Sequence, residues 1–223
     1  MKLIKKTSSI LVMCLLFTSL KAQTLIVDYD FALNLAGAQG DATTSALLQK
    51  LMGSTSTNIF FRLTYCKGKS SSKKMEKTNT ESKTLKFEGK MHDIFKDFLT
   101  GTFYMSNLQQ ENTIVKQTMA GFHNWKILDE YETIKGYKCR KAVSKDRDKD
   151  VIAWFTSDIA ITEGPGVHFG LPGLILKVQT HANILEAKEI TFEKTDSVIN
   201  MPTAAKVLDF NEFSTLQQGS KKD

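Results

Sequence analysis

Residues 122–180 read FHNWKILDEYETIKGYKCRKAVSKDRDKDVIAWFTSDIAITEGPGVHFGLPGLILKVQT, and this stretch decides the fold class. Four segments in it have the composition of β-strands and are separated by charged or turn-forming residues: 125–128, 137–143, 151–156 and 174–180. The charged run 146–150, DRDKD, has the composition of a hairpin turn between two of them. Short strands at this regular spacing predict an antiparallel meander.

The flanking sequence extends this pattern. Alternating apolar residues predict strands at 24–33 and 58–66, and weaker patterns predict strands at 84–87, 102–104, 113–119, 184–192 and 205–210. Helical spacing of apolar residues predicts short helical segments at 41–53 and 91–99, while the lysine- and serine-rich run 67–77 is typical of a solvated loop. We therefore expect a mainly β (α+β) fold, with a single curved antiparallel sheet in the form of a half-barrel and one or two short helices.

The N-terminal residues have the pattern of a secretory signal peptide. Three lysines precede an apolar run at 10–20, which is about half of the roughly 20 residues that a transmembrane helix needs. Cleavage after Ala22 divides the chain into a leader, 1–22, and one domain, 23–223. We expect an exported protein, periplasmic, outer-membrane associated or secreted, with no transmembrane segment once the leader is removed.

The charge of the mature chain gives little support for a nucleic-acid partner. The leader holds four lysines and no acidic residue, which leaves 26 basic against 24 acidic side chains. A balance this close to neutral lacks the basic excess of nucleic-acid-binding domains. We therefore expect no nucleic-acid partner.

Two cysteines remain after the leader, Cys66 and Cys139. An oxidising compartment would permit them to form a disulfide, whereas two separate buried thiols would serve as small apolar side chains. Strand alternation places Cys139 on the face opposite Lys138 and Arg140, which favours a structural thiol over a reactive one.

The motifs of the C-terminal half resemble the GLPGLI family, a group of exported proteins from Bacteroidetes-type bacteria with no established activity. The signature itself is Gly170-Leu171-Pro172-Gly173-Leu174-Ile175. The upstream stretches W-K-I at 125–127, I-K-G-Y-K-C-R-K-A at 134–142 and A-W-F-T at 153–156 are similar to the approach to the signature in that family. One departure is Ala160, where the family usually has a proline.

The signature also has a physical interpretation. Leu171-Pro172-Gly173-Leu174 fits a type II turn, which would place Leu174, Leu176 and Val178 on one face of the next strand. The segment is then a structural corner. The alternative is that the glycine-rich approach GPGVHFG lines the mouth of an apolar cavity, because loops on rigid scaffolds commonly carry binding sites.

Candidate chemistry is sparse. The four histidines, His92, His123, His168 and His181, show no metal-ligand spacing, so we expect no metal, no cofactor and no catalytic residue. Trp125, Trp154, His168 and Phe169 are the candidate ligand-binding residues, although aromatic residues on alternating strands mostly serve as core.

Three functions remain open. The first is a noncatalytic envelope protein that binds an apolar small molecule, a lipid or an outer-membrane protein on the concave side of the sheet. The second is a hydrolase or metal-dependent enzyme that uses His123, His168 and nearby carboxylates such as Asp158 and Glu163. The third is an adaptor that offers a sheet edge to an outer-membrane system.

Overall fold

The computed structural model describes residues 24–34, 56–78, 91–106, 108, 112–146 and 148–219. One open sheet of twelve strands accounts for most of them, and one helix follows the last strand. The expected mainly β fold with a single curved sheet is confirmed. The elements are β1 (Thr24–Leu33), β2 (Ser56–Cys66), β3 (Lys69–Glu76), β4 (Asp93–Asp97), β5 (Thr102–Ser106), β6 (Thr113–Thr118), β7 (Lys126–Ile134), β8 (Tyr137–Asp146), β9 (Lys149–Thr156), β10 (Leu174–Gln179), β11 (Asn183–Glu193), β12 (Lys206–Leu208) and α3 (Phe210–Gly219).

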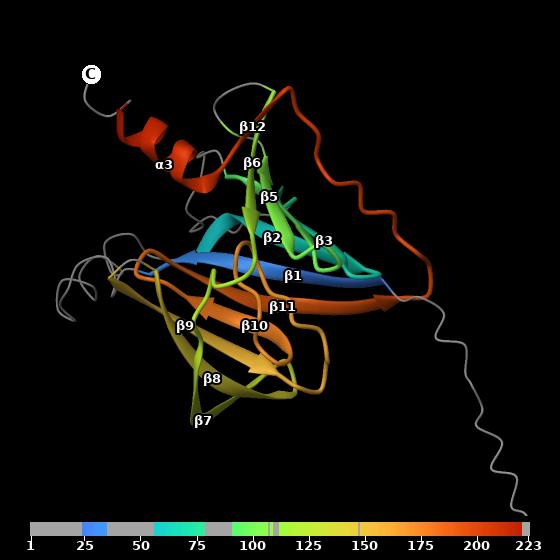
Figure 1. Cartoon of the computed structure of the whole chain (residues 1–223). Helices are drawn as coiled ribbons and strands as arrows, with labels where there is room; N and C mark the ends of the chain where they lie inside the picture. Colours follow the sequence, from blue (N-terminus) through green and yellow to red (C-terminus); the bar gives the residue numbers. More distant parts are fainter. Residues whose placement is uncertain are drawn as a thin grey trace, which may run out of the picture.

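Two antiparallel meanders meet at the first strand. The strand order is β12-β6-β5-β4-β3-β2-β1-β11-β10-β9-β8-β7, so β1 lies in the middle and pairs with β2 on one side and β11 on the other. Every pairing is antiparallel except that of β12 with β6. Figure 1 shows how the strand direction changes from β1 and β11 to β5 and β6, which run steeply across them.

A short connection requires this sheet to curl. Residues 119–125 join β6, near one end of the strand order, to β7 at the other end. In a flat sheet ten strand spacings of about 4.8 Å would separate these strands by about 48 Å. Eight residue steps of about 3.5 Å reach only about 28 Å. The ends of the sheet therefore approach each other, and the connection passes over the inner face.

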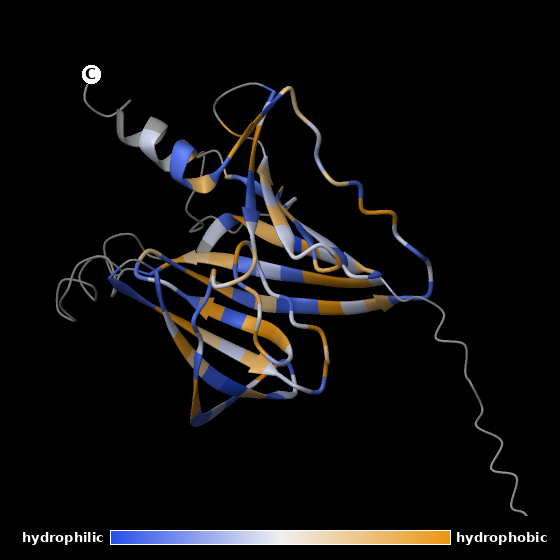
Figure 2. Cartoon of the chain, viewed as in Figure 1, coloured by the Kyte–Doolittle hydropathy of each residue, from blue (hydrophilic) through white to orange (hydrophobic). Residues whose placement is uncertain are grey.

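Alternating side chains build the core on that inner face. Leu25, Val27, Tyr29 and Phe31 of β1 are all buried, as the sequence pattern predicts. Cross-strand pairing continues the row of Val27 through Leu63 of β2 on one side and Ile190 of β11 on the other. Figure 2 shows the resulting alternation of hydrophobic and hydrophilic positions along the strands.

The sequence predicts most other strands correctly as well. The segments around 102–104, 113–119, 125–128, 137–143, 151–156, 174–180, 184–192 and 205–210 all contain strands, and 146–150 contains the turn between β8 and β9. The predicted helical segment at 41–53 and the strand at 84–87 lie outside the described residues.

The loop predicted at 67–77 is wrong, because this segment contains β3. A tight turn at Lys67 and Gly68, both with positive φ, reverses the chain after β2, and β3 then pairs with β2 along its whole length. Its inward residues are Ser70 and Ser72, which are buried. Small polar residues on the inner face removed the apolar alternation by which a strand is recognised.

The helical segment predicted at 91–99 is also wrong, because Asp93–Asp97 form β4. Ile94 and Phe95 are adjacent and both buried, Ile94 within the core and Phe95 beneath the ammonium group of Lys73, which lies 5.3 Å from the ring centroid. A strand buried on both faces shows no alternation, so its apolar residues resembled one face of a helix.

The two cysteines are free and buried in this structure. Cys66 ends β2, and Cys139 lies in β8 with its side chain in the core, where burial raises the pKa of the thiol to about 11. Cys66 and Cys139 are therefore two separate buried thiols, and they do not form a disulfide in this structure. Within the described residues, no helix has the length and apolar character to cross a membrane.

Candidate functional site

A long connection, here called the inner loop (residues 157–173), runs between β9 and β10 and fills the inner face of the curled sheet. It folds back on itself through backbone hydrogen bonds. Gly170 N donates to Thr162 O at 3.0 Å, and Leu174 N donates to Ile159 O at 3.0 Å. The GLPGLI signature spans the end of this loop and the start of β10, and its residues Leu171, Leu174 and Ile175 are buried.

The turn in this signature is tighter than the predicted type II turn. Gly173 N donates to Leu171 O at 2.8 Å, which makes a three-residue turn centred on Pro172, while Leu174 N bonds to Ile159 instead of closing a four-residue turn. Glycine is required at 173 because a Cβ there would lie 2.1 Å from the carbonyl oxygen of Thr156. The signature is therefore a point of close contact between the inner loop and the end of β9.

The strand after the turn also departs from simple alternation. A bulge between Ile175 and Lys177 shifts the register of β10 against β9. Val178 consequently packs with Ile175 in one buried cluster, while Leu174 and Leu176 belong to another. The prediction that Leu174, Leu176 and Val178 share one face is wrong, because the extra residue of the bulge reverses the alternation.

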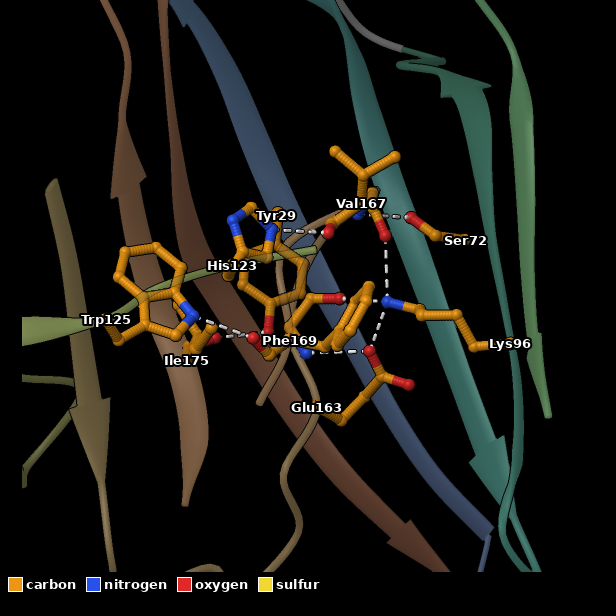
Figure 3. A network of polar contacts seen from close by, with 11 residues as sticks. Tyr29, Ser72, Lys96, His123, Trp125, Glu163, Val167, Phe169 and Ile175 are labelled. Atoms are coloured by element: carbon orange, nitrogen blue, oxygen red, sulfur yellow. Dashed lines mark hydrogen bonds and ion pairs between the residues drawn. The ribbon is translucent and has the colours of Figure 1, made fainter. Parts of the chain in front are cut away.

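A buried ion pair joins the inner loop to the opposite wall of the sheet. Lys96 of β4 donates to a carboxylate oxygen of Glu163, and both side chains are completely buried. The same ammonium group donates to Gly164 O at 2.9 Å and to Gly166 O at 2.8 Å. Figure 3 shows these contacts converging on the ammonium nitrogen. All three ammonium hydrogens thus have an acceptor in the inner loop.

The neighbouring strands make room for this contact. Ser70 and Ser72 of β3 pair across the ladder with Lys96 and Ile94, so their small side chains lie beside the ion pair on the inner face. Ser72 Oγ accepts a hydrogen bond from Gly166 N at 3.1 Å. No residue larger than glycine fits at position 164, because a Cβ there would lie 2.7 Å from His168 O.

Burial governs the protonation of the groups around the pair. It lowers the pKa of Lys96, although the charge and hydrogen bond of Glu163 oppose this shift. It also raises the pKa of Tyr29 well above its usual value, and the negative charge of Glu163 adds to the effect. The Tyr29 hydroxyl donates to Ile175 O at 2.6 Å, which fixes the start of β10 to the middle of β1 (Figure 3).

Phe169 lies inside an aromatic cluster. Its ring contacts those of Phe98, Phe103 and Phe122, with centroid distances of 6.4, 5.8 and 5.8 Å. Trp125 is half-buried and its indole N–H donates to Phe169 O at 2.8 Å. Both residues therefore hold the inner loop and the connection 119–125 together.

Trp154 lies elsewhere. It packs against the cluster that contains Leu25 and Leu174, whereas Trp125 packs against the cluster around Leu171. Of the four candidate ligand-binding residues, the structure brings together Trp125, His168 and Phe169 and leaves Trp154 apart.

His123 and His168 stack on each other with a centroid distance of 5.4 Å. His123 Nε2 donates to Val167 O at 2.8 Å, and burial lowers the pKa of this ring. Burial lowers the pKa of His168 to about 3, with smaller contributions from the charges of His123 and Lys96. Across the described residues, no group of three or more histidine, cysteine or acidic side chains is arranged to hold a metal ion.

A pocket, here called the end pocket, opens at the end of the inner face where β1 ends and β2 begins. Its volume is about 330 Å³. Its apolar wall comprises Phe31, Phe61, Met91, Ile94, Val151, Val167 and Leu185, and its polar groups are Asp146, Lys149, Thr180, Asn183, His92, His168 and His181. Three of the four histidines of the chain therefore line one pocket, and the fourth stacks on His168.

A larger hollow of about 430 Å³ lies on the outer face, between β1, β2, β3 and β11. Six of its nine lining residues are charged, and two ion pairs lie among them, Lys77 with Asp30 at 3.0 Å and Lys188 with Asp30 at 3.9 Å. The end pocket is the better candidate site because seven of its lining residues are apolar, five of them buried, against two apolar residues in the outer hollow.

Sequence analysis missed Lys96 and the shared location of His92, His168 and His181. Lys96 stands between Phe95 and Asp97 in a segment that resembled a helix, and a lysine there suggests a solvated face. The sequence carried no signal for the inward position of Ser70 and Ser72, because Ser71 between them is a serine as well.

Comparisons with known proteins do not assign an activity to this chain. A family model described as a protein of unknown function (Porph_ging) matches residues 143–177, from β8 to β10. No curated protein matches the chain. Two solved structures of PNGF-II, in the P21 and C2 space groups, have TM-scores of 0.60 and 0.57 with 16% and 15% sequence identity.

The likeness to PNGF-II covers 89% and 90% of this chain but only 34% and 33% of the PNGF-II chains. This chain thus spans about a third of their length, and at such low identity the match concerns the fold alone. The protein is therefore similar in sequence to a family of unknown function across the inner loop, and it shares its fold with one part of PNGF-II.

Proposed function

We propose that this protein is an exported cell-envelope member of the GLPGLI family that binds an apolar or amphipathic small molecule in the end pocket and does not transform it. The observation that carries the proposal is the end pocket itself, whose walls include the buried side chains Phe31, Phe61 and Leu185. A concave site whose wall is apolar, with polar groups beside that wall, is a usual form of a small-molecule site.

The inner loop gives a reason for the pocket to be preformed. Lys96, Glu163 and Ser72 hold the loop against β3 and β4, and Gly166, Val167 and His168 of the same loop form part of the pocket wall. A wall fixed by a buried ion pair loses little conformational entropy when a ligand binds, which favours affinity. Lys96 and Glu163 themselves are sealed from the pocket by complete burial, so they serve binding indirectly.

The sheet-edge adaptor has weaker support. β7 is an edge strand with exposed Ile127 and Tyr131, but it also carries exposed Asp129 and Glu130 and a register shift between Ile127 and Tyr131. Charges and irregularities on an edge strand are devices that prevent pairing with another chain. The arrangement therefore argues for binding in the pocket over binding along the edge.

The neutral fluorescent probe phenylnaphthylamine tests the proposal, because its emission rises in apolar surroundings. The mature protein should bind it with one site per chain. Ala182→Trp should abolish binding, since Ala182 is an exposed residue at the pocket mouth and an indole there covers the opening. Ala205→Trp is the matched control, because Ala205 is exposed and does not line the pocket.

Two outcomes would count against the proposal: no saturable probe binding by the folded protein, or equal binding by Ala182→Trp and the unaltered chain. Native mass spectrometry of protein purified from the cell envelope, before and after solvent extraction, adds an independent observation. A bound small molecule that extraction removes is the expected result. Export is tested separately, by the intact mass of the envelope fraction, which should correspond to a chain beginning at residue 23.

A further inference from the structure

We infer that the end pocket takes a single-chain amphiphile with a zwitterionic head group. The apolar chain lies in the pocket, and the cation and anion of the head group meet Asp146 and Lys149 at its mouth. The inference rests on the proposed function, because it names the chemical class of ligand for the same pocket.

The pocket combines an apolar interior with a charged mouth. Phe31, Phe61 and Leu185 are buried in its wall. Asp146 and Lys149 line the pocket as well but are exposed, so their charges stay in contact with water. Apart from histidines, they are the charged side chains among the described residues of the lining. An amphiphile matches this division, because its chain leaves water while its head group stays hydrated.

The β8–β9 hairpin sets the two charges side by side. Asp146 and Lys149 are opposite each other in the ladder, and such residues project from the same face with Cβ atoms about 5 Å apart. Lys149 shares that face with the buried Val151 of the pocket wall, because alternate residues of a strand point the same way. Burial lowers the pKa of His123 under the inner loop, and the negative charge of Asp146 is one of the influences that oppose this shift. Both charges therefore face the pocket mouth.

Neither charge is committed to an ion pair within the described part of the chain. The adjacent pair in the ladder, Lys145 and Asp150, points to the opposite face and does form one, at 2.6 Å. Asp146 and Lys149 thus remain available to a ligand.

Two opposite charges this close together favour a head group that carries both signs. An anionic head group attracted to Lys149 would also lie close to Asp146, so attraction and repulsion would largely cancel. A cationic head group attracted to Asp146 meets the same problem at Lys149. A zwitterion places each of its charges beside the opposite one and gains from both contacts.

The size of the pocket limits the apolar part. Its volume of about 330 Å³ lies at the low end of the range of roughly 300–1,000 Å³ for small-molecule sites. A single medium-length alkyl chain matches this space, while a lipid with two long chains exceeds it.

Displacement of phenylnaphthylamine by three decyl amphiphiles tests the head-group preference. They are the zwitterion N-decyl-N,N-dimethylglycine, the cation decyltrimethylammonium and the anion decyl sulfate, each used at neutral pH and low salt, below its micelle concentration. The zwitterion should displace the probe at a concentration about fivefold lower than either ion, a modest factor because contacts between exposed charges are weak. In about 1 M salt this preference should disappear, since the screening length falls to about 3 Å.

Removing one charge at a time should reverse the order of the two ions. Asp146→Asn should make decyl sulfate bind several-fold more tightly than decyltrimethylammonium, and Lys149→Gln should do the opposite. Both residues are exposed, so both variants should fold and bind the neutral probe as before. Asp150→Asn and Lys145→Gln are the matched controls, because they make the same changes of charge in the same hairpin at residues that do not line the end pocket. The controls should keep the preference for the zwitterion.

Three outcomes would overturn the inference and leave the proposed function standing. Either ion might displace the probe from the unaltered protein as well as the zwitterion does. Asp146→Asn and Lys149→Gln might leave the order of the two ions unchanged, or the control variants might shift it equally. Absence of probe binding by the unaltered protein would defeat both the inference and the proposed function.

Discussion

Replacing Lys96 by methionine should remove a large part of the stability of the fold. Methionine has a similar length but no charge and no donor, so Glu163 would remain as a buried carboxylate that still accepts a hydrogen bond from Gly164 N–H at 2.7 Å but has lost its counter-charge. The carbonyl groups of Gly164 and Gly166 would lose their bonds to the ammonium group as well. The perturbation thus leaves two buried acceptors and one part-buried acceptor without the group that satisfied them.

The magnitude follows from these contacts. Removing one partner of a buried ion pair costs about 3–5 kcal/mol. Each orphaned carbonyl adds about 1 kcal/mol, partly included in the first figure, so we expect a loss of about 4–6 kcal/mol. Single domains are stable by about 5–15 kcal/mol. The Lys96→Met variant should therefore unfold at a clearly lower urea concentration than the unaltered chain.

Equilibrium unfolding in urea at neutral pH, followed by the fluorescence of Trp125 and Trp154, measures this loss. The double variant Lys96→Met, Glu163→Leu separates the ion pair from other effects, because it removes the stranded charge. It should be more stable than Lys96→Met alone by at least about 2 kcal/mol, since replacing both ions is far less harmful than removing one. A loss below about 1 kcal/mol in the single variant, or a double variant as unstable as the sum of the two single variants, would refute the reasoning.

Three further predictions concern other parts of the molecule. Gly173→Ala should destabilise the fold by about 3 kcal/mol or more, because its Cβ would overlap the carbonyl oxygen of Thr156 at the end of β9. Gly170→Ala, with φ of +91° and open space around it, should cost about 1–2 kcal/mol. Urea unfolding compares the two variants, and equal losses would contradict the close contact at Gly173. His168 should stay neutral in NMR titrations from pH 7.5 to pH 4.5, because burial lowers its pKa to about 3. The free energy of unfolding should therefore fall as the pH drops below about 6.5, by up to about 1.4 kcal/mol per pH unit, and this slope should be smaller in His168→Phe. A ring that titrates near pH 6.5 in the folded protein would overturn this. Cys139, whose pKa burial raises to about 11, should resist alkylation in the folded protein, and the buried Cys66 should resist it as well. After unfolding, mass spectrometry should find both cysteines alkylated without prior reduction. A requirement for reduction before alkylation would show a disulfide and contradict the prediction.

The local pattern of side chains was sufficient to predict most of the sheet. β1 alternates cleanly because one face meets the core and the other meets solvent, and residues such as Val27 and Tyr29 record this directly in the sequence. The β8–β9 hairpin was equally readable, because a charged turn separates two strand-like segments. In β1 and β9 one face is buried and the other is more exposed, so the local period carries the information.

Alternation of apolar and polar residues failed to predict strands that do not have one face on the apolar core and the other in solvent. The inward residues of β3 are serines because the inner loop packs against them, and β4 is buried on both faces. The bulge in β10 and the tight turn at Pro172 depend on contacts with β9 that are distant in sequence. Local periodicity contains no information about such partners.

The sequence by itself determined that this chain forms a mainly β fold, which residues of β1 and of β2 share a face, and that the glycines of 164–173 mark a special conformation. Only the tertiary structure decided that Lys96 meets Glu163 across 67 positions and that His92, His168 and His181 line one pocket. The physical reason is that alternation is a property of neighbouring residues, whereas an ion pair or a pocket arises when a curled sheet brings distant strands to the same side.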